Sequence, residues 1–345
     1  MEVRKVQVIG GTTFIVSLPK KWVNQVGLKP SEELILVPKG NSSLLIKLKR
    51  DAEKILNSAI SIEVNSRKKE EILRLIIAAY LAGYQNIKLV SSLQIDPSIE
   101  SFIRNNSWKF MGLEISEEHD KEMILTTLFN SSALTIQKGL SKMLRAVSSM
   151  HRNAIKAFVE NDVKMAEETV KLDDEVDRLN LFIIRQLMLT QGSLAASNIG
   201  ISMLEESLIY RTIVKDLERI GDYAVEIAKK TSKDLKIPSS LRRELIELSQ
   251  AATRTYQDAL DIFLANDVEN VDKVFRDEEE FLKKMKSILD SYVADKSLDP
   301  ASLIKLIQVI DILRMAMNKG RSIINETYNR YITYLSTTLK HQRDL

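Results

Sequence analysis

The sequence contains no cysteine and only three histidines, His119, His151 and His341. Without cysteine, the protein has no disulfides, no thiolate zinc sites, no iron–sulfur ligands and no cysteine nucleophile. The histidines stand far apart along the chain, so we do not expect a histidine-rich metal site. Metal binding, if present, is therefore expected to use oxygen ligands.

Long apolar runs are also missing. No run approaches the ~18 residues that a membrane-spanning helix needs, and the first residues, MEVRKVQVIGG, lack the apolar stretch of a secretory signal. We therefore expect a cytoplasmic protein without membrane insertion. The GxSxG, P-loop and HExxH motifs are absent, as is GxGxxG in a strand–helix setting, so we expect no enzyme. With 345 residues, 44% of them hydrophobic, the chain has room for two or three domains.

Basic charge is concentrated at one end of the chain. Residues 1–50 carry nine Lys/Arg against three Asp/Glu, a balance of +6, whereas the remainder holds 41 bases against 44 acids, or −3. Contact with a polyanion such as DNA therefore belongs to the first 50 residues if it occurs at all. The alternative is that a small domain is basic by chance.

Residues 1–50 predict a small β module. Gly10 and Gly11 lie between two arms with alternating apolar residues, Val6, Val8, Phe14, Val16 and Leu18. Pro19 opens a short helical turn that Gly27 closes, and a second hairpin follows over 34–37 and 44–46. So short a segment cannot bury two hairpins alone. It is expected to pair with a second copy or to dock on the rest of the protein.

Residues 51–129 predict a mixed α/β domain that connects the flanking regions. We expect a helix with Ser66 as its N-cap and its end at Gly83, a strand over 87–90, a helix over 97–105 and a final hairpin over 113–116 and 123–126. No functional site is predicted here.

From about residue 130 the chain is predicted to be helical, with breaks near 161–162, 192–200, 237–238, 266–267 and 299–300. The segments HRNAIKAFVENDV at 151–163 and YQDALDIFLANDV at 256–268 share five residues at an offset of 105. This internal repeat predicts two three-helix bundles, over 130–234 and 235–345. The predicted fold class is therefore multi-domain and mainly α, with a β module, a small α/β domain and tandem three-helix bundles.

Two acidic pairs occur on neighbouring predicted helices. Asp173 and Asp177 are four residues apart, as are Glu218 and Asp222, so each pair lies on one helix face. Four carboxylates this close would require protons or cations, and oxygen ligands favour Mg, Mn, Ca or Fe. Gly221 costs about 1 kcal/mol inside a helix and predicts a close approach there. The alternative is a solvated acidic surface, balanced in part by Arg178 and Arg219.

The segments DDEVD at 173–177 and DLERIGDYAVEIAKK at 216–230 resemble the PhoU family, over about residues 130–335. The resemblance implies tandem three-helix bundles, iron- or zinc-type clusters on the bundle surface, and regulation of phosphate uptake through the phosphate ABC transporter. The ligands it implies are Asp173, Asp177, Glu218, Asp222 and, one turn on, Glu226. The metal stays open among Fe, Zn, Mn and Mg. A second cluster is not expected, because aligned positions of the second bundle carry apolar residues, Leu282, Leu313 and Met317.

The segment GGTTFIVSLPKKWVNQVGLKPSEELILVPKG resembles the AbrB/SpoVT family. The resemblance implies a homodimer with swapped hairpins and a basic surface that lies on DNA. The candidate DNA contacts are Arg4, Lys5, Lys20, Lys21 and Lys39. The alternative is that this module serves dimerisation only.

Together these resemblances imply a cytoplasmic regulator of phosphate uptake that acts on transcription. Two alternatives stay open. One is a carboxylate-bridged metal-dependent enzyme or metal-storage protein, although the Glu-x-x-His motif of ferritin-like di-iron sites is absent. The other is an adaptor without metal or DNA.

Overall fold

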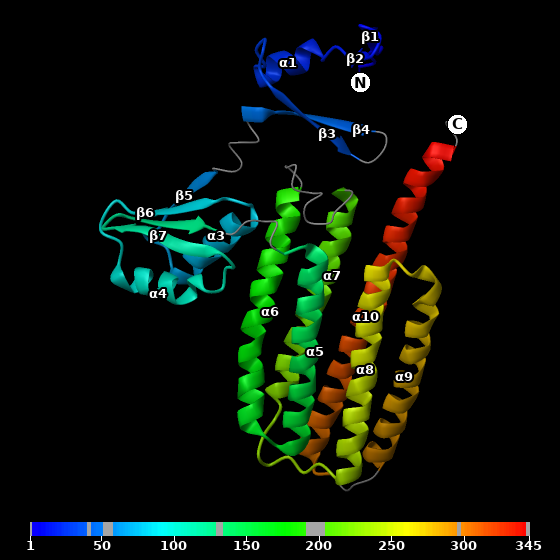
Figure 1. The fold of residues 1–345 in the computed structure, drawn as a ribbon. Coiled ribbons are helices and arrows are strands. Elements are labelled where there is room, and N and C mark those ends of the chain that lie inside the picture. Colours follow the sequence, from blue (N-terminus) through cyan, green and yellow to red (C-terminus); the bar gives the residue numbers. More distant parts are fainter. Residues whose placement is uncertain are drawn as a thin grey trace. The chain divides into compact units, whose positions relative to one another are not determined.

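The computed structural model describes residues 2–39, 43–50, 58–128, 134–190, 204–294 and 298–342. The chain divides into two compact units, Met1–Asn57 and Ser58–Leu345. The second unit contains a small α/β domain and a bundle of long helices (Figure 1). The mainly helical, multi-domain architecture predicted above is confirmed.

In the first unit, the described residues include two antiparallel hairpins and the short helix α1. Its elements are β1 (Gln7–Ile9), β2 (Thr13–Ile15), α1 (Lys20–Val26), β3 (Leu34–Lys39) and β4 (Ser43–Leu48). As predicted, α1 follows Pro19 and ends at Gly27, whose φ of 61° is the left-handed conformation that glycine adopts most readily. Leu48 is the one buried residue among those described in this unit. The unit thus lacks a core of its own.

The α/β domain is built on a four-stranded sheet with the order β5-β6-β8-β7, in which β5 runs parallel to β6 and the other pairs are antiparallel. Its elements are β5 (Ala59–Glu63), α3 (Lys69–Leu81), β6 (Asn86–Val90), α4 (Pro97–Ser107), β7 (Leu113–His119) and β8 (Glu122–Thr127). The strand β5 was not predicted. The prediction of Ser66 as an N-cap was wrong: Lys68 precedes the helix, and Ser66 has a φ of 58°, whereas an N-cap residue is normally extended.

Six long helices make up the rest of the second unit. They are α5 (Ile136–Glu160), α6 (Val163–Thr190), α7 (Leu204–Ala228), α8 (Ser239–Ala265), α9 (Val271–Ala294) and α10 (Pro300–Gln342), with a short 3-10 turn, η3 (Val268–Asn270), before α9. Four of the five breaks fall where the sequence predicted, and the break predicted near residues 192–200 lies outside the described residues. Asn161 and Asn266, which end α5 and α8, both take left-handed conformations, so the repeat also preserves its turns.

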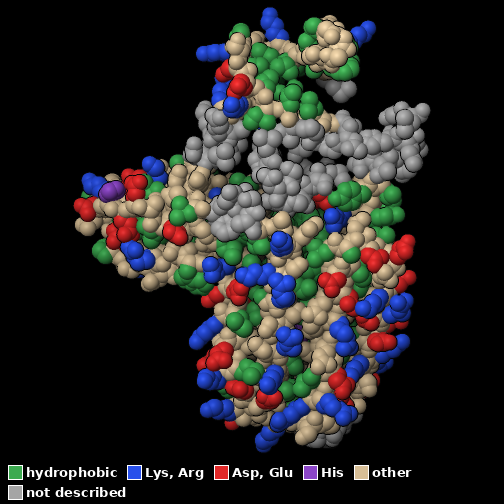
Figure 2. Space-filling view, viewed as in Figure 1, with side chains coloured by type: hydrophobic (Ala, Val, Ile, Leu, Met, Phe, Trp, Pro, Cys, Tyr) green, Lys and Arg blue, Asp and Glu red, His purple; other side chains and the backbone are tan. Residues whose placement is uncertain are grey.

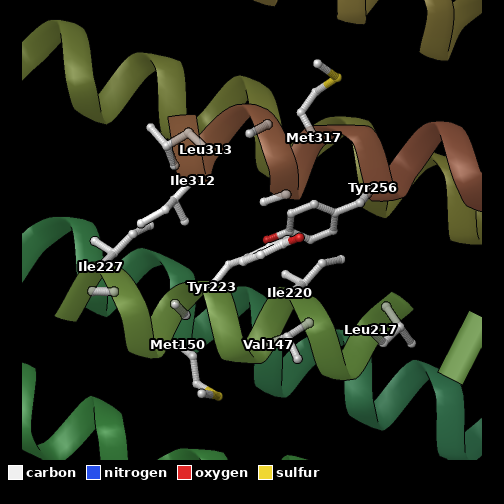
Figure 3. Close-up of a cluster of buried hydrophobic side chains, with 14 of the residues drawn as sticks. Val147, Met150, Leu217, Ile220, Tyr223, Ile227, Tyr256, Ile312, Leu313 and Met317 are labelled. Carbon is white, nitrogen blue, oxygen red and sulfur yellow. The ribbon is translucent and has the colours of Figure 1, made fainter. Parts of the chain in front are cut away.

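The two three-helix sets share one apolar core. Figure 3 shows part of it, where side chains of α5, α7, α8 and α10 meet. His151 and Tyr256 occupy corresponding positions of the repeat, and the Tyr256 hydroxyl lies 3.2 Å from Nδ1 of His151. Contact between corresponding residues is what a local two-fold axis between the two sets produces. No helix in the described part of the chain is both long and apolar enough to cross a membrane.

Candidate carboxylate site and N-terminal basic surface

The acidic residues predicted as ligands lie on α6 and α7, two helices that pack against each other. Asp173, Glu218 and Asp222 are half-buried, whereas Asp177 is exposed. Glu226, one turn further along α7, is also exposed, and no hydrogen bond or ion pair among the described residues joins it to the other four.

The carboxylates of α7 are close enough to α6 to raise the pKa values of Asp173 and Asp177. Burial, followed by the neighbouring charges of Asp177 and Asp222, raises the pKa of Asp173 to about 7. Burial of its carboxyl group, followed by the charges of Glu218 and Asp222, raises the pKa of Asp177. Like charges that disfavour each other's ionised form are the expected result of such crowding. The structure thus brings Asp173, Asp177, Glu218 and Asp222 together into one electrostatic group.

Gly221 allows this crowding. A Cβ atom at Gly221 would lie 3.3 Å from Oδ1 of Asp173 and 3.4 Å from Cγ1 of Val176. The missing side chain therefore lets the Asp173 carboxylate lie directly against the backbone of α7. This is the close approach that a glycine in a helix predicted.

Only part of the negative charge is balanced by cations. Lys215 Nζ lies 3.1 Å from Oε1 of Glu218, and Arg219 Nη1 lies 3.0 Å from Oδ2 of Asp222. Among the described residues, none forms an ion pair with Asp173 or Asp177. Arg178, which was expected to help, has a buried Nε without a hydrogen-bond partner.

Asn180 is a neighbour of the site that the sequence did not reveal. Its Nδ2 donates a long hydrogen bond of 3.5 Å to Oε1 of Glu218, while its buried Oδ1 has no partner. The residue lies three positions after Asp177 and so shares its side of α6. That spacing is the one signal in the sequence that could have identified it.

The donor chemistry of the site suits a hard cation, because carboxylate and amide oxygens are the ligands that such ions prefer. The spacing of these side chains is less suited to binding a cation. Within the described ranges, no three His, Asp or Glu side chains form a group that could hold a metal ion. The carboxylates of α6 and α7 would therefore have to rotate towards each other before they could share one.

At the positions that correspond to the four carboxylates of α6 and α7, the described residues of the second set of helices form no such acidic group. Glu278 corresponds to Asp173 and is ion-paired with Arg321 at 3.3 Å, while the exposed Leu282 corresponds to Asp177. Leu313 and Met317 are fully buried, unlike the surface residues Glu218 and Asp222 with which the sequence aligned them. Shifting this alignment by one residue restores the pattern of burial. The surface positions of α10 that correspond to Glu218 and Asp222 are then Arg314 and Asn318. The corresponding positions of the second set therefore hold one acid, Glu278, which is paired with Arg321.

The first unit presents basic side chains that its own acids do not neutralise. The three acids among the described residues of this unit are already paired: Glu2 with Arg4, Glu32 with Arg50 and Glu33 with Lys49. The candidate contacts Lys5, Lys20 and Lys21 are exposed and form no ion pair within the described part of the unit. Lys39 ends β3, and its side chain lies outside what the structure describes.

The same unit exposes an unusual amount of apolar surface. Every residue of β1 and β2 is exposed, including Val8 at 54%, Ile9 at 56% and Phe14 at 75%. Figure 2 shows hydrophobic side chains at the surface of this unit. Apolar patches of this kind are rare on isolated soluble domains and mark interaction surfaces.

Comparison with known families matches two parts of the chain. The PhoU domain matches residues 140–231, which include most of α5, all of α6 and α7, and the four carboxylates. In this part of its helical region the chain is similar to the PhoU family. The family described as "Antidote-toxin recognition MazE, bacterial antitoxin" matches residues 7–54. The N-terminal module is therefore MazE/AbrB-like.

Several curated relatives are named phosphate-specific transport system accessory protein PhoU homologues. The Thermotoga maritima protein, homologue 1, is 27% identical over 143 residues, which are 41% of this chain and 60% of that protein. The Pseudomonas putida protein is 25% identical over 191 residues, covering 54% of this chain and 72% of that protein. The Deinococcus radiodurans protein is 32% identical over 103 residues, which are 30% of this chain and 46% of that protein. The chain thus spans less than two thirds of two of these three relatives.

Two solved PhoU structures are also similar. The Streptococcus pneumoniae protein superposes with a TM-score of 0.48 at 15% identity, covering 56% of this chain and 91% of that one. The Pseudomonas aeruginosa protein gives a TM-score of 0.43 at 18% identity, covering 56% and 93%.

Proposed function

We propose that the protein is a cytoplasmic regulator of phosphate uptake that joins a PhoU-type helical region to a DNA-binding module. One observation carries the proposal: a PhoU domain and a MazE-like domain match separate parts of the same chain. The relatives of the helical region are named accessory proteins of phosphate transport. The partners proposed for this region are components of the phosphate ABC transporter, and this role requires no catalytic residue.

Deletion of the gene in the source organism tests the role in phosphate uptake. We expect the deletion strain to take up phosphate at a rate that no longer responds to the phosphate supply, and the full-length chain to restore the response. Uptake of labelled phosphate at low and high phosphate measures this. An unchanged response in the deletion strain would contradict the proposal.

We propose further that the first unit binds DNA as a homodimer. The apolar faces of β1 and β2 are best covered by a second copy of the same hairpin, because the unit buries almost nothing by itself. The unpaired lysines Lys5, Lys20 and Lys21 would then face DNA phosphates from both copies. Contacts to phosphates give affinity that falls steeply with salt and depends little on sequence.

Sedimentation and gel shifts test the two parts of this proposal separately. Replacing the exposed Phe14 with Ser should convert the dimer to a monomer, and a wild-type protein that sediments as a monomer would refute the dimer. Lys20→Glu/Lys21→Glu should abolish duplex binding at low salt. The matched control, Lys229→Glu/Lys233→Glu, changes the net charge equally on exposed residues of the second unit and should still bind.

Finally, we propose that the carboxylate group of α6 and α7 holds a divalent or trivalent cation. The support is the unbalanced charge of Asp173 and Asp177 and the unpartnered oxygen of Asn180 beside Glu218. Elemental analysis of the purified protein tests this, together with Glu218→Gln/Asp222→Asn, which should lose the metal. A metal that stays bound in this variant would place it elsewhere.

A metal-free adaptor is the second candidate function. The observation in its favour is that the described carboxylates do not form a ready-made ligand set. Absence of any metal from the wild-type protein, even after incubation with Mn, Fe and Zn salts, would favour it. Metal-dependent turnover or a large metal load would instead favour an enzyme or a storage protein.

A further inference from the structure

A buried arginine connects α6 to the α/β domain. Arg185 is 5% exposed and donates hydrogen bonds to the carbonyl oxygens of Tyr80, Gly83 at 3.2 Å and Tyr84 at 3.0 Å. These three carbonyls lie at the C-terminal end of α3. The guanidinium group also lies over the ring of Tyr80, 4.7 Å from its centroid.

The positive charge of Arg185 has no carboxylate partner among the described contacts. A buried, unpaired charge is costly. Here the end of α3 compensates it, because a helix C-terminus carries partial negative charge and its last carbonyls lack partners within the helix. The face of the Tyr80 ring adds a cation–π contact. Burial of Arg185 is therefore favourable only while the end of α3 is in place.

Close packing surrounds this contact. Gly83 has a φ of 94°, and a Cβ atom there would lie 2.7 Å from Cδ2 of Leu189. Leu181 packs against the core of the α/β domain, and Leu81 of α3 contacts both that core and the core of the helices. Positions 181, 185 and 189 are four residues apart, so one continuous face of α6 contacts the α/β domain.

We propose that Arg185 is a latch that holds the α/β domain in one orientation on α6. The latch makes α6 a shared element, because the same helix carries Asp173 and Asp177 of the carboxylate group. Asp177 and Arg185 are eight residues apart, about 12 Å along the helix axis. A movement of α6 at the carboxylates therefore reaches the end of α3 through Arg185. The latch itself does not depend on a bound cation or on the function proposed above.

Hydrogen–deuterium exchange of the full-length protein tests the latch. In Arg185→Met, which keeps the length and apolar part of the side chain, we expect amides at residues 80–86 to exchange at least about tenfold faster, as loss of hydrogen bonds to a charged group predicts. The amides of residues 87–90 in β6 and those of β8 should stay protected, because the α/β domain has its own core. The matched control is Lys171→Met, which removes an exposed cation from the same helix and should leave exchange unchanged.

Two results would overturn the proposal. Unchanged exchange at residues 80–86 in Arg185→Met would show that the arginine does not hold the end of α3. Equal loss of protection in β6 and β8 would show that Arg185 is needed to fold the domain rather than to dock it. If Arg185→Met does not fold, Arg185→Lys gives the same test, because its ammonium group keeps the charge but does not replace the five fixed donors of the guanidinium group. Exchange at residues 80–86 that stays slow in Arg185→Lys would likewise overturn the latch.

Discussion

At the scale of residues, Asp173 links protonation to stability. Its pKa is raised from 3.8 to about 7 in the folded protein. Between pH 4 and 7 the native state therefore binds more protons at this site than the unfolded state, and the free energy of unfolding falls as pH rises through that window. Above pH 7 the Asp173 carboxylate is charged in both the folded and the unfolded state. The folded protein then bears the full free-energy cost of a charged carboxylate at this half-buried site.

Replacing Asp173 with Asn should remove this penalty. We expect the metal-free variant to be more stable than the wild type at pH 8, by on the order of 1–2 kcal/mol for a half-buried group, and about equal to it at pH 4. Urea unfolding of EDTA-treated protein at both pH values measures the difference. Asp234→Asn, an exposed aspartate away from α6, is the control. The interpretation fails if both variants show the same pH dependence.

Two helix glycines make a second comparison between residues. A Cβ atom at Gly320 would lie 3.0 Å from the backbone carbon and oxygen of Thr255, which cannot move aside, whereas one at Gly221 meets only side-chain atoms at 3.3 Å or more. Gly320→Ala should therefore destabilise the protein by about 1–3 kcal/mol despite the better helix propensity of alanine. Gly221→Ala should stay within about 1 kcal/mol of the wild type. Denaturant unfolding measures both, and equal losses would refute the distinction.

At the scale of elements, a buried arginine joins α10 to α7 and α8. Arg330 Nε lies 3.2 Å from Oε1 of Glu206, its Nη1 donates to the Phe263 carbonyl at 3.1 Å, and its guanidinium lies over the ring of Phe263. Glu206 is 1% exposed. Removal of the arginine would leave a buried carboxylate with a hydroxyl donor, Tyr334, but without its cation.

Arg330→Met should therefore destabilise the helical region by about 3 kcal/mol, because it removes one member of a buried ion pair. Arg314→Met, on the same helix, breaks the surface pair with Asp311 and should cost less than about 0.5 kcal/mol. Thermal unfolding of both variants provides the test. Similar losses of stability in Arg330→Met and Arg314→Met would show that burial of the Arg330–Glu206 pair does not increase its contribution to stability.

The elements were largely predictable from local sequence, whereas the contacts between them were not. Helix ends at Asn161 and Asn266 followed from the repeated Asn-Asp, and α1 from Pro19 and Gly27. The strand β5 was missed although Ile60 and Ile62 alternate with polar residues as in a half-buried strand, because the pattern extends over only five residues.

The carboxylate group was predictable because spacing within two neighbouring helices determines it. Asn180 was missed because its spacing from Asp177 is a weak signal for an uncharged residue, and its importance comes from the packing of α7 against it. The partners of Arg185 lie about 100 residues earlier in the chain, and they are backbone carbonyls. No side-chain pattern encodes such a contact.

At the scale of the whole molecule, α6 connects the carboxylate group to the α/β domain, to which the first unit is joined in sequence. If a cation binds between α6 and α7, it reduces the repulsion among their carboxylates and should make both helices more rigid. The latch at Arg185 would transmit part of this change to the end of α3. Binding of the proposed cation and its effect through Arg185 can be tested separately, with one variant that lacks Arg185 and one that lacks the carboxylates of α6.

Addition of Mn²⁺ to the wild-type protein should slow hydrogen exchange both at residues 173–180 and at residues 80–86. In Arg185→Met, we expect slower exchange at residues 173–180 alone, because the cation still binds but the contact with α3 is lost. In Asp173→Asn/Asp177→Asn, neither segment should respond. A wild-type protein in which Mn²⁺ slows exchange at the carboxylates and leaves residues 80–86 unaffected would show that α6 binds the ion without passing the change to the α/β domain.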